Sequence, residues 1–212
     1  MKEKILIFID GSCYNQSFNR IELENLDEIK MTYGGWAIIA VSSDEEYNNP
    51  KVIYEKSDGV FNTTNNRMEI EAFIESLRFI KDNIAKTGKK DGYVIVSDSQ
   101  FLIKSVLFYI KKWVINDWKT VNGLPVKNQE QFKICYDLYY KFLKNQEKVD
   151  IELKWIKSHT NKSDIFSLYN NLVDLKAKEI ANSYKEDHID EYNDLENKLK
   201  FKFAEKMIKN YE

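Results

Sequence analysis

The pattern of hydrophobic and polar residues predicts strands first and then an alternation of helices and strands. Apolar runs at residues 4–10, 34–41 and 51–56 are rich in β-branched and aromatic side chains, with turn-forming residues between them. Short runs at 93–97 and 150–155 predict a fourth and a fifth strand. This order indicates an α/β fold in which helices cover a mixed sheet.

Apolar residues at helical spacing predict a helix after the third strand. Asn66, followed three residues later by Glu69, matches a capping box at the start of this helix. We expect further helices to begin near residues 100 and 171 and to span 129–143. The apolar residues that recur in the helix after the third strand are Met68, Phe73, Leu77, Ile80 and Ile84.

Three segments interrupt this alternation. Residues 14–33 are polar and acidic and too long for a tight hairpin, so they predict an inserted loop. Residues 108–125 interleave aromatics with lysines and predict a protruding helix pair, the handle. Residues 184–212 predict a C-terminal helical extension to a domain spanning 1–183. Its apolar stripe, typical of a helix that docks on the domain's own core, consists of Leu195, Leu199, Phe203 and Met207.

Composition excludes several classes of protein. Hydrophobic residues make up 43% of the 212-residue chain, which has only 2 Pro and 7 Gly, so it should fold rather than remain disordered. No run is long enough to span a membrane or to form a signal peptide, which predicts a cytoplasmic protein with no membrane partner. Cys13 and Cys135 lack the spacing of a zinc site or a disulfide framework.

Net charge is −2, but residues 84–162 carry 15 Lys and Arg against 8 Asp and Glu. This basic segment is either a phosphate-facing surface or a solvated lysine face.

Four acidic residues fall at predicted strand ends and helix starts, namely Asp10, Glu69, Asp98 and Asp174. Each has a structural explanation as a turn, cap or capping-box residue. If they converge, however, two charges about 4 Å apart repel by about 4 kcal/mol at an effective dielectric of 20, so the cluster needs cations. Oxygen ligands without His or Cys favour Mg²⁺ or Mn²⁺, and a pair of such ions is typical of phosphodiester hydrolysis.

Six sequence blocks resemble the ordered motifs of type 1 ribonucleases H. They are Ile-Phe-Ile-Asp-Gly-Ser at 7–12, Asn-Thr-Thr-Asn-Asn-Arg-Met-Glu at 62–69, Ser-Asp-Ser-Gln at 97–100, Pro-Val-Lys-Asn at 125–128, Trp-Ile-Lys-Ser-His at 155–159 and Asn-Asn-Leu-Val-Asp at 170–174. The resemblance implies a five-stranded sheet of order 3-2-1-4-5. It also implies hydrolysis of the RNA strand of RNA/DNA hybrids, leaving 5′-phosphate and 3′-hydroxyl ends.

The same resemblance assigns roles to individual residues. Asp10, Glu69, Asp98 and Asp174 are expected to bind two Mg²⁺ ions, for which Mn²⁺ can substitute, and His159 occupies the position of a loop histidine that assists proton transfer or product departure. Asn65, Asn66 and Gln100 suit contacts to 2′-hydroxyls, because amides both donate and accept hydrogen bonds. Thr64 and Asn128 match positions that hold a phosphate of the DNA strand. Further expected contacts to the DNA strand come from Tyr109, Trp113, Phe132, Lys111, Lys112 and Lys119.

The chain also departs from the family pattern. The 14–33 insertion replaces a glycine-rich turn, Asn62 stands where many bacterial relatives carry Arg, and the loop after His159 is longer than usual. Two alternatives remain: another nuclease on the same fold, or a non-catalytic module that binds hybrids and uses the four acids only as caps. We expect a monomer.

Overall fold

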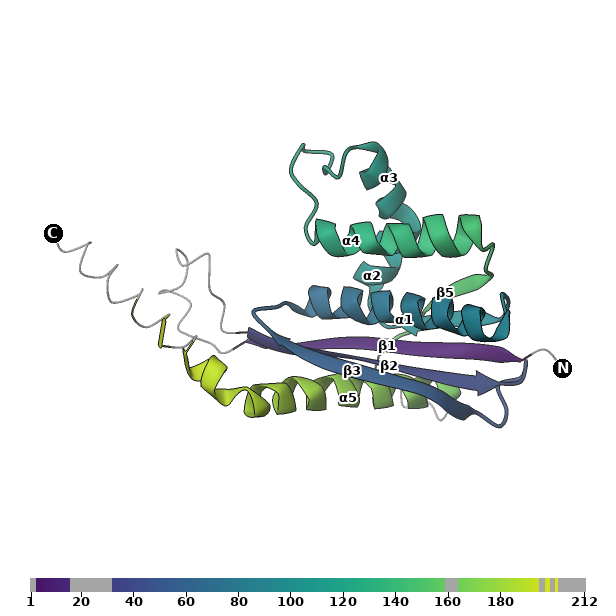
Figure 1. The fold of residues 1–212 in the computed structure, drawn as a ribbon, viewed down its shortest axis with the longest axis horizontal. Coiled ribbons are helices and arrows are strands. Elements are labelled where there is room, and N and C mark those ends of the chain that lie inside the picture. Colours follow the sequence, from purple (N-terminus) through teal and green to yellow (C-terminus); the bar gives the residue numbers. More distant parts are fainter. Residues whose placement is uncertain (1–2, 16–31, 159–163, 195–196, 199–200, 202–212) are drawn as a thin grey trace.

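The computed structural model describes residues 3–15, 32–158, 164–194, 197–198 and 201. It contains a five-stranded sheet of order β3-β2-β1-β4-β5, which confirms the expected strand order (Figure 1). The strands are β1 (Lys4–Asn15), β2 (Thr32–Ser43), β3 (Lys51–Phe61), β4 (Tyr93–Ser97) and β5 (Ile151–Trp155).

The sheet is mixed in direction. Strands β1, β2 and β3 form an antiparallel meander, whereas β4 pairs in parallel with β1 on one side and with β5 on the other. The carboxyl ends of β1, β4 and β5 therefore point to the same edge of the sheet, which is where loops and helix starts of an α/β fold converge.

Helices cover both faces of the sheet (Figure 1). Helix α1 packs on one face with the handle region stacked beyond it, and α5 packs alone on the other. The helices are α1 (Asn65–Thr87), α2 (Gln100–Lys104), α3 (Ile110–Ile115), α4 (Gln129–Cys135) and α5 (Ile165–Asp187), with π-helical segments η1 (Ser105–Tyr109) and η2 (Tyr136–Gln146).

Strand β1 is apolar on both faces because it lies between two helical layers. Ile7 and Ile9 belong to the core shared with α1, whereas Leu6 and Phe8 belong to the core shared with α5. Phe8 stacks on Tyr169 of α5 with ring centroids 5.3 Å apart. A strand buried on both faces reads as a continuous apolar run, which explains the pattern of residues 4–10.

Two glycines of the sheet allow helices to approach its backbone closely. A Cβ atom at Gly11 of β1 would lie 2.3 Å from the amide nitrogen of Glu69 in α1. A Cβ atom at Gly35 of β2 would lie 2.5 Å from the carbonyl oxygen of Ala177 in α5. The absence of side chains at these positions therefore sets the height of both helices above the sheet.

The first three strands are longer than the sequence predicted. The Asp10-Gly11-Ser12 stretch, predicted to end the first strand, lies inside β1, where Gly11 pairs with Trp36 of β2. Strand β2 begins at Thr32 and β3 extends to Phe61. The expected 14–33 loop is therefore shorter at both ends, and residues 16–31 lie outside the described part of the chain.

Two predicted helix starts are wrong. The N-cap of α1 is Thr64, whose hydroxyl accepts a hydrogen bond from the Arg67 amide, so Asn66 and Glu69 do not form the capping box. Helix α5 begins at Ile165, capped by the Asp164 carboxylate, rather than near residue 171. Asp174 is consequently in the third turn of α5 and not in its first.

The handle contains one short helix instead of the predicted pair. Helix α3 ends at Ile115 and is followed by a loop that an isolated bridge between Lys119 and Pro125 closes. The Asn116 amide donates hydrogen bonds to the carbonyls of Lys119 and Thr120, which orders the turn. The handle is thus a helix followed by a hydrogen-bonded loop that projects away from the sheet (Figure 1).

The division into a domain of residues 1–183 and an extension stays a prediction. Helix α5 runs without interruption through residue 183 to Asp187. The apolar positions 195, 199, 203 and 207 lie outside the described residues. Among the helices that the structure describes, none has both the length and the apolar character needed to cross a bilayer.

Replacing Gly11 with Ala should destabilise the fold by about 1–3 kcal/mol or more, because the new methyl group would collide with the backbone of α1. Gly88→Ala is the control: Gly88 has a φ of +70° but open space around it, so only backbone strain of about 1–2 kcal/mol is expected. Urea denaturation measures both. A Gly11→Ala variant that loses no more stability than Gly88→Ala would contradict this packing argument.

Candidate active site

Three carboxylates from three different elements meet at one edge of the sheet. Asp10 belongs to β1, Glu69 to the second turn of α1, and Asp98 follows the last residue of β4. One oxygen from each lies within 4.8 Å of the others. The structure therefore brings together three of the four acids that the sequence analysis singled out.

Burial and mutual repulsion disfavour the charged forms of these acids. Asp10 and Glu69 are only 5% and 4% exposed. Burial first, and then the charges of Asp98 and Asp174, raise the pKa of Asp10 to about 8, although the Gly11 amide donates a hydrogen bond that lowers it. Burial and the charge of Asp10 raise the pKa of Glu69 well above its ordinary value. The protein alone therefore favours protonated forms of Asp10 and Glu69, and a bound cation would favour their ionised forms.

Asp174, the fourth acid, lies close enough to Asp10 and Glu69 to affect their pKa values, but it is not one of the three acids whose oxygens meet within 4.8 Å. Its charge raises the pKa values of Asp10 and Glu69, and its Oδ2 atom accepts a hydrogen bond from Lys178 Nζ at 2.7 Å. Lys178 is one turn further along α5, so the helix delivers both a carboxylate and a cation that partly balances it. This hydrogen bond raises the pKa of Lys178.

A divalent cation fits the donor set of this cluster. Glu69 Oε2 is buried and has no hydrogen-bond partner among the described residues. An unpaired buried carboxylate oxygen is costly unless a cation binds it. Because all the donors are carboxylate oxygens, hard ions such as Mg²⁺ or Mn²⁺ match the site better than softer metals.

Polar residues expected to contact substrate surround the start of α1. Thr64 caps α1, and the exposed Asn65 and Asn66 form its first turn beside Glu69. Gln100 is exposed at the first position of α2, where its side chain accepts a hydrogen bond from Lys104. The structure thus places these residues on helix starts near the acidic cluster, while their substrate contacts stay predictions.

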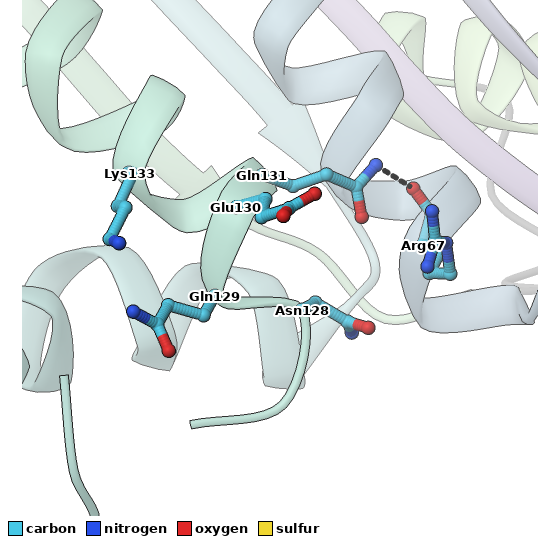
Figure 2. Close-up of a pocket in the computed structure, with 6 residues that line it drawn as sticks. All are labelled: Arg67, Asn128, Gln129, Glu130, Gln131 and Lys133. Carbon is cyan, nitrogen blue, oxygen red and sulfur yellow. Dashed lines mark hydrogen bonds between the residues drawn. The ribbon is translucent and has the colours of Figure 1, made fainter. Parts of the chain in front are cut away.

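A pocket of about 390 Å³ lies between the start of α1 and the start of α4 (Figure 2). Asn128, in the left-handed conformation at the N-cap of α4, lines it together with Arg67 and Lys133. The Gln131 side chain donates a hydrogen bond to the Arg67 carbonyl and ties the two helices together. The sequence analysis predicted Asn128 as a phosphate contact but missed Arg67, which comes to Asn128 only through the packing of α1 against α4, and Lys133, which follows Asn128 on α4.

The three aromatics predicted to border the DNA strand differ in exposure. Tyr109 is 46% exposed and stacks on Trp113, whose ring packs in turn against Phe132 with centroids 5.0 Å apart. Phe132 is fully buried. The expectation that Phe132 borders a nucleic-acid strand is therefore wrong; it supports Trp113 from below.

The predicted lysines of the handle are exposed. Lys112 lies over the Tyr109 ring and Lys111 over the Tyr140 ring, 4.4 Å from its centroid. The Lys119 ammonium lies 3.9 Å from the Asp117 carboxylate. These three cations remain accessible to a phosphate backbone. His159, the remaining predicted catalytic residue, lies outside the described residues.

Comparison with known proteins identifies relatives of the whole domain. The family model described as RNase H matches residues 2–182. A curated protein named Ribonuclease H from Wigglesworthia glossinidia brevipalpis is 34% identical over 161 residues, which cover 76% of this chain and 80% of the relative.

Solved structures show the same fold. The solution structure of the PFV RNase H domain matches with a TM-score of 0.62 at 17% identity, covering 86% of this chain and 97% of that domain. The foamy viral protease-reverse transcriptase in complex with RNA/DNA hybrid matches with a TM-score of 0.62 at 17% identity, covering 84% of this chain and 20% of that one. At these identities the two structures support the fold alone.

Asp10→Asn should stabilise the metal-free protein at pH 7.5 by about 1–3 kcal/mol. The pKa of Asp10 is raised to about 8 from 3.8, so its ionisation in the unfolded chain opposes folding. This cost is absent below about pH 4, where both states are protonated, and it grows toward pH 8. The advantage of the variant should therefore vanish at pH 4.

Urea denaturation with a chelator at both pH values measures the effect. Asp82→Asn, at an exposed position of α1, controls for the loss of an acidic group. An equal advantage of Asp10→Asn at both pH values, or none at pH 7.5, would argue against buried charge repulsion.

Proposed function

The chain belongs to the ribonuclease H family, and we propose that it hydrolyses the RNA strand of RNA/DNA hybrids with two bound Mg²⁺ ions, leaving 5′-phosphate and 3′-hydroxyl ends. The observation that carries this proposal is the meeting of Asp10, Glu69 and Asp98 within 4.8 Å at the sheet edge. Caps and turn residues need no such convergence, which favours a catalytic site over a module that only binds hybrids.

Asp10, Glu69, Asp98 and Asp174 are the residues that would hold the ions. When bound, divalent ions of such a site lower the pKa of a coordinated water and stabilise charge on the departing oxygen. The chain's contribution is to fix the carboxylates in advance, since β1, α1, β4 and α5 are all anchored in the core. Lys178 holds the Asp174 carboxylate at 2.7 Å and limits the repulsion within the cluster.

Recognition of a hybrid follows from the groups around the cluster. Asn65, Asn66 and Gln100 are exposed amides, which suit 2′-hydroxyls because they both donate and accept hydrogen bonds. The match to the RNase H family model and to a relative named Ribonuclease H supports this substrate class. We further propose that His159 assists proton transfer or product departure.

The DNA strand would then run across α1, α4 and the handle. Thr64 and Asn128 would hold one of its phosphates. Arg67 and Lys133 line the pocket at Asn128 and outweigh the single acid there, Glu130, so the pocket lining is positive on balance. Tyr109 and Trp113 offer a stacked aromatic surface to the DNA strand. The following phosphates of that DNA strand would contact the handle lysines, Lys111, Lys112 and Lys119.

Incubation with labelled RNA/DNA hybrid, single-stranded RNA or duplex DNA tests the activity, each with Mg²⁺, Mn²⁺ or a chelator. We expect cleavage of the RNA strand of the hybrid alone, dependent on a divalent ion. Asp98→Asn should lower kcat at least 100-fold with the fold intact, because one carboxylate of the shared site is lost. An Asp98→Asn variant with a kcat close to that of the parent, cutting of duplex DNA, or metal-independent binding without turnover would each refute the proposal.

Arg67→Ala should raise KM for the hybrid about tenfold with kcat unchanged, because a charge-assisted phosphate contact is lost. It should also lower the slope of log affinity against log salt by about 1. The backbone groups of Arg67 hold the local structure, so folding should be unaffected.

Lys86→Ala removes an equal charge from the exposed last turn of the same helix and serves as the control. If both variants shift KM equally, the effect is general charge and the pocket makes no specific contact.

A further inference from the structure

Asn170 of α5 carries a buried polar atom that the proposed mechanism does not use. The residue is 3% exposed, and its Nδ2 donates a hydrogen bond to Asp98 Oδ2 at 3.1 Å. Its other amide atom, Oδ1, is buried and has no partner among the described residues. An unsatisfied buried acceptor costs about 1–3 kcal/mol and calls for a physical reason.

The reason lies in the charge of Asp98. If the amide rotated by half a turn, its oxygen would face the carboxylate of Asp98 and repel it. The orientation that donates to Asp98 therefore wins, and the amide oxygen is left unpaired as a consequence. The side chain is thus oriented for the benefit of Asp98 rather than for its own hydrogen bonding.

Asp98 needs such support because it lies outside the regular elements. It follows the end of β4 and precedes Ser99, the N-cap of α2. The Trp155 indole of β5 donates a hydrogen bond to the Asp98 carbonyl at 2.9 Å, which anchors the backbone. The carboxylate torsion is soft, so the backbone anchor alone does not fix the oxygens.

Repulsion would turn an unrestrained Asp98 carboxylate away from its neighbours. Asp10 and Glu69 are buried acids whose pKa values Asp98 already raises. The hydrogen bond from Asn170 opposes this rotation. Asn170 also lies one turn before Asp174, and Asp174 one turn before Lys178, so one face of α5 presents three groups to the cluster in sequence.

We propose that Asn170 is a positioning residue that holds the Asp98 carboxylate toward Asp10 and Glu69 and so preforms the divalent-cation site. The inference rests on the proposed function and adds a residue to it. Asn170 acts on the ion only through Asp98, so its loss should weaken metal binding without altering the contacts to the hybrid.

Calorimetric titration with MgCl₂ in the absence of nucleic acid is the main test. Asn170→Ala should raise the Mg²⁺ dissociation constant about 10- to 100-fold, the range found when a hydrogen-bond partner of a metal ligand is removed. Asn171→Ala, at the exposed neighbouring position of the same helix, should bind Mg²⁺ like the parent. At saturating Mg²⁺, KM for the hybrid should be unchanged in Asn170→Ala. Equal Mg²⁺ affinity in both variants, or a raised KM at unchanged Mg²⁺ affinity, would overturn the proposal.

A second pair of variants shows whether Asn170 acts through Asp98. In an Asp98→Asn background, Asn170→Ala should no longer change the residual Mg²⁺ affinity, because its target is gone. A full effect in that background would overturn the proposal. Asn170→Ser, whose hydroxyl is too short to replace the amide, should reproduce the loss and guards against poor folding of the alanine variant.

The two proposals fail in different ways. If the parent binds Mg²⁺ with an affinity that depends on Asn170 but does not cleave hybrid, the proposed function is wrong and the positioning role stands. If the parent cleaves hybrid and Asn170→Ala binds Mg²⁺ normally, only the positioning role is wrong.

Discussion

Electrostatic repulsion among buried carboxylates is the constraint on which this structure depends. Asp10 and Glu69 are almost fully buried, and Asp98 brings an oxygen within 4.8 Å of both. Nothing within such a group favours assembly, so the surrounding fold must supply the restraint. It does so by taking each acid from a different, independently packed element. The packing energy of the two hydrophobic cores thus offsets the repulsion among the acids and holds them in a site that favours cation binding.

The five strands follow from strong local patterns, whereas their order in the sheet came from the resemblance to type 1 ribonucleases H. The four acids were singled out by their places at predicted strand ends and helix starts. The run at 93–97 is a strand with those bounds, and the continuous apolar run of β1 follows from burial on two faces. Segment ends were harder to predict. Gly11 and Ser12 are typical turn residues, yet pairing with β2 keeps them in the strand. The start of α5 was missed although Asp164 is a good capping residue, because the polar residues around it suggested a loop.

Several other contacts between distant segments could not be predicted from the sequence. Phe132 was grouped with exposed aromatics, but its position on α4 turns it into the core beneath Trp113. Arg67 and Lys133 reach the same pocket only once α1 and α4 pack together. Asn170 lies in the block at 170–174, but its hydrogen bond to Asp98 spans 72 positions of the chain. Such residues are defined by what they touch, which periodicity and spacing do not reveal.

The close seating of α5 on Gly35 has a wider consequence. A helix whose carbonyl at Ala177 and amide at Ala181 rest directly against strand backbone has no compressible layer beneath it. A shift or rotation of α5 would bring its backbone into collision with β2, so the side chains of α5 keep fixed positions relative to the sheet. Variation in such a protein is therefore channelled into loops and chain ends, which can lengthen or change composition while the spacing of the acids is preserved.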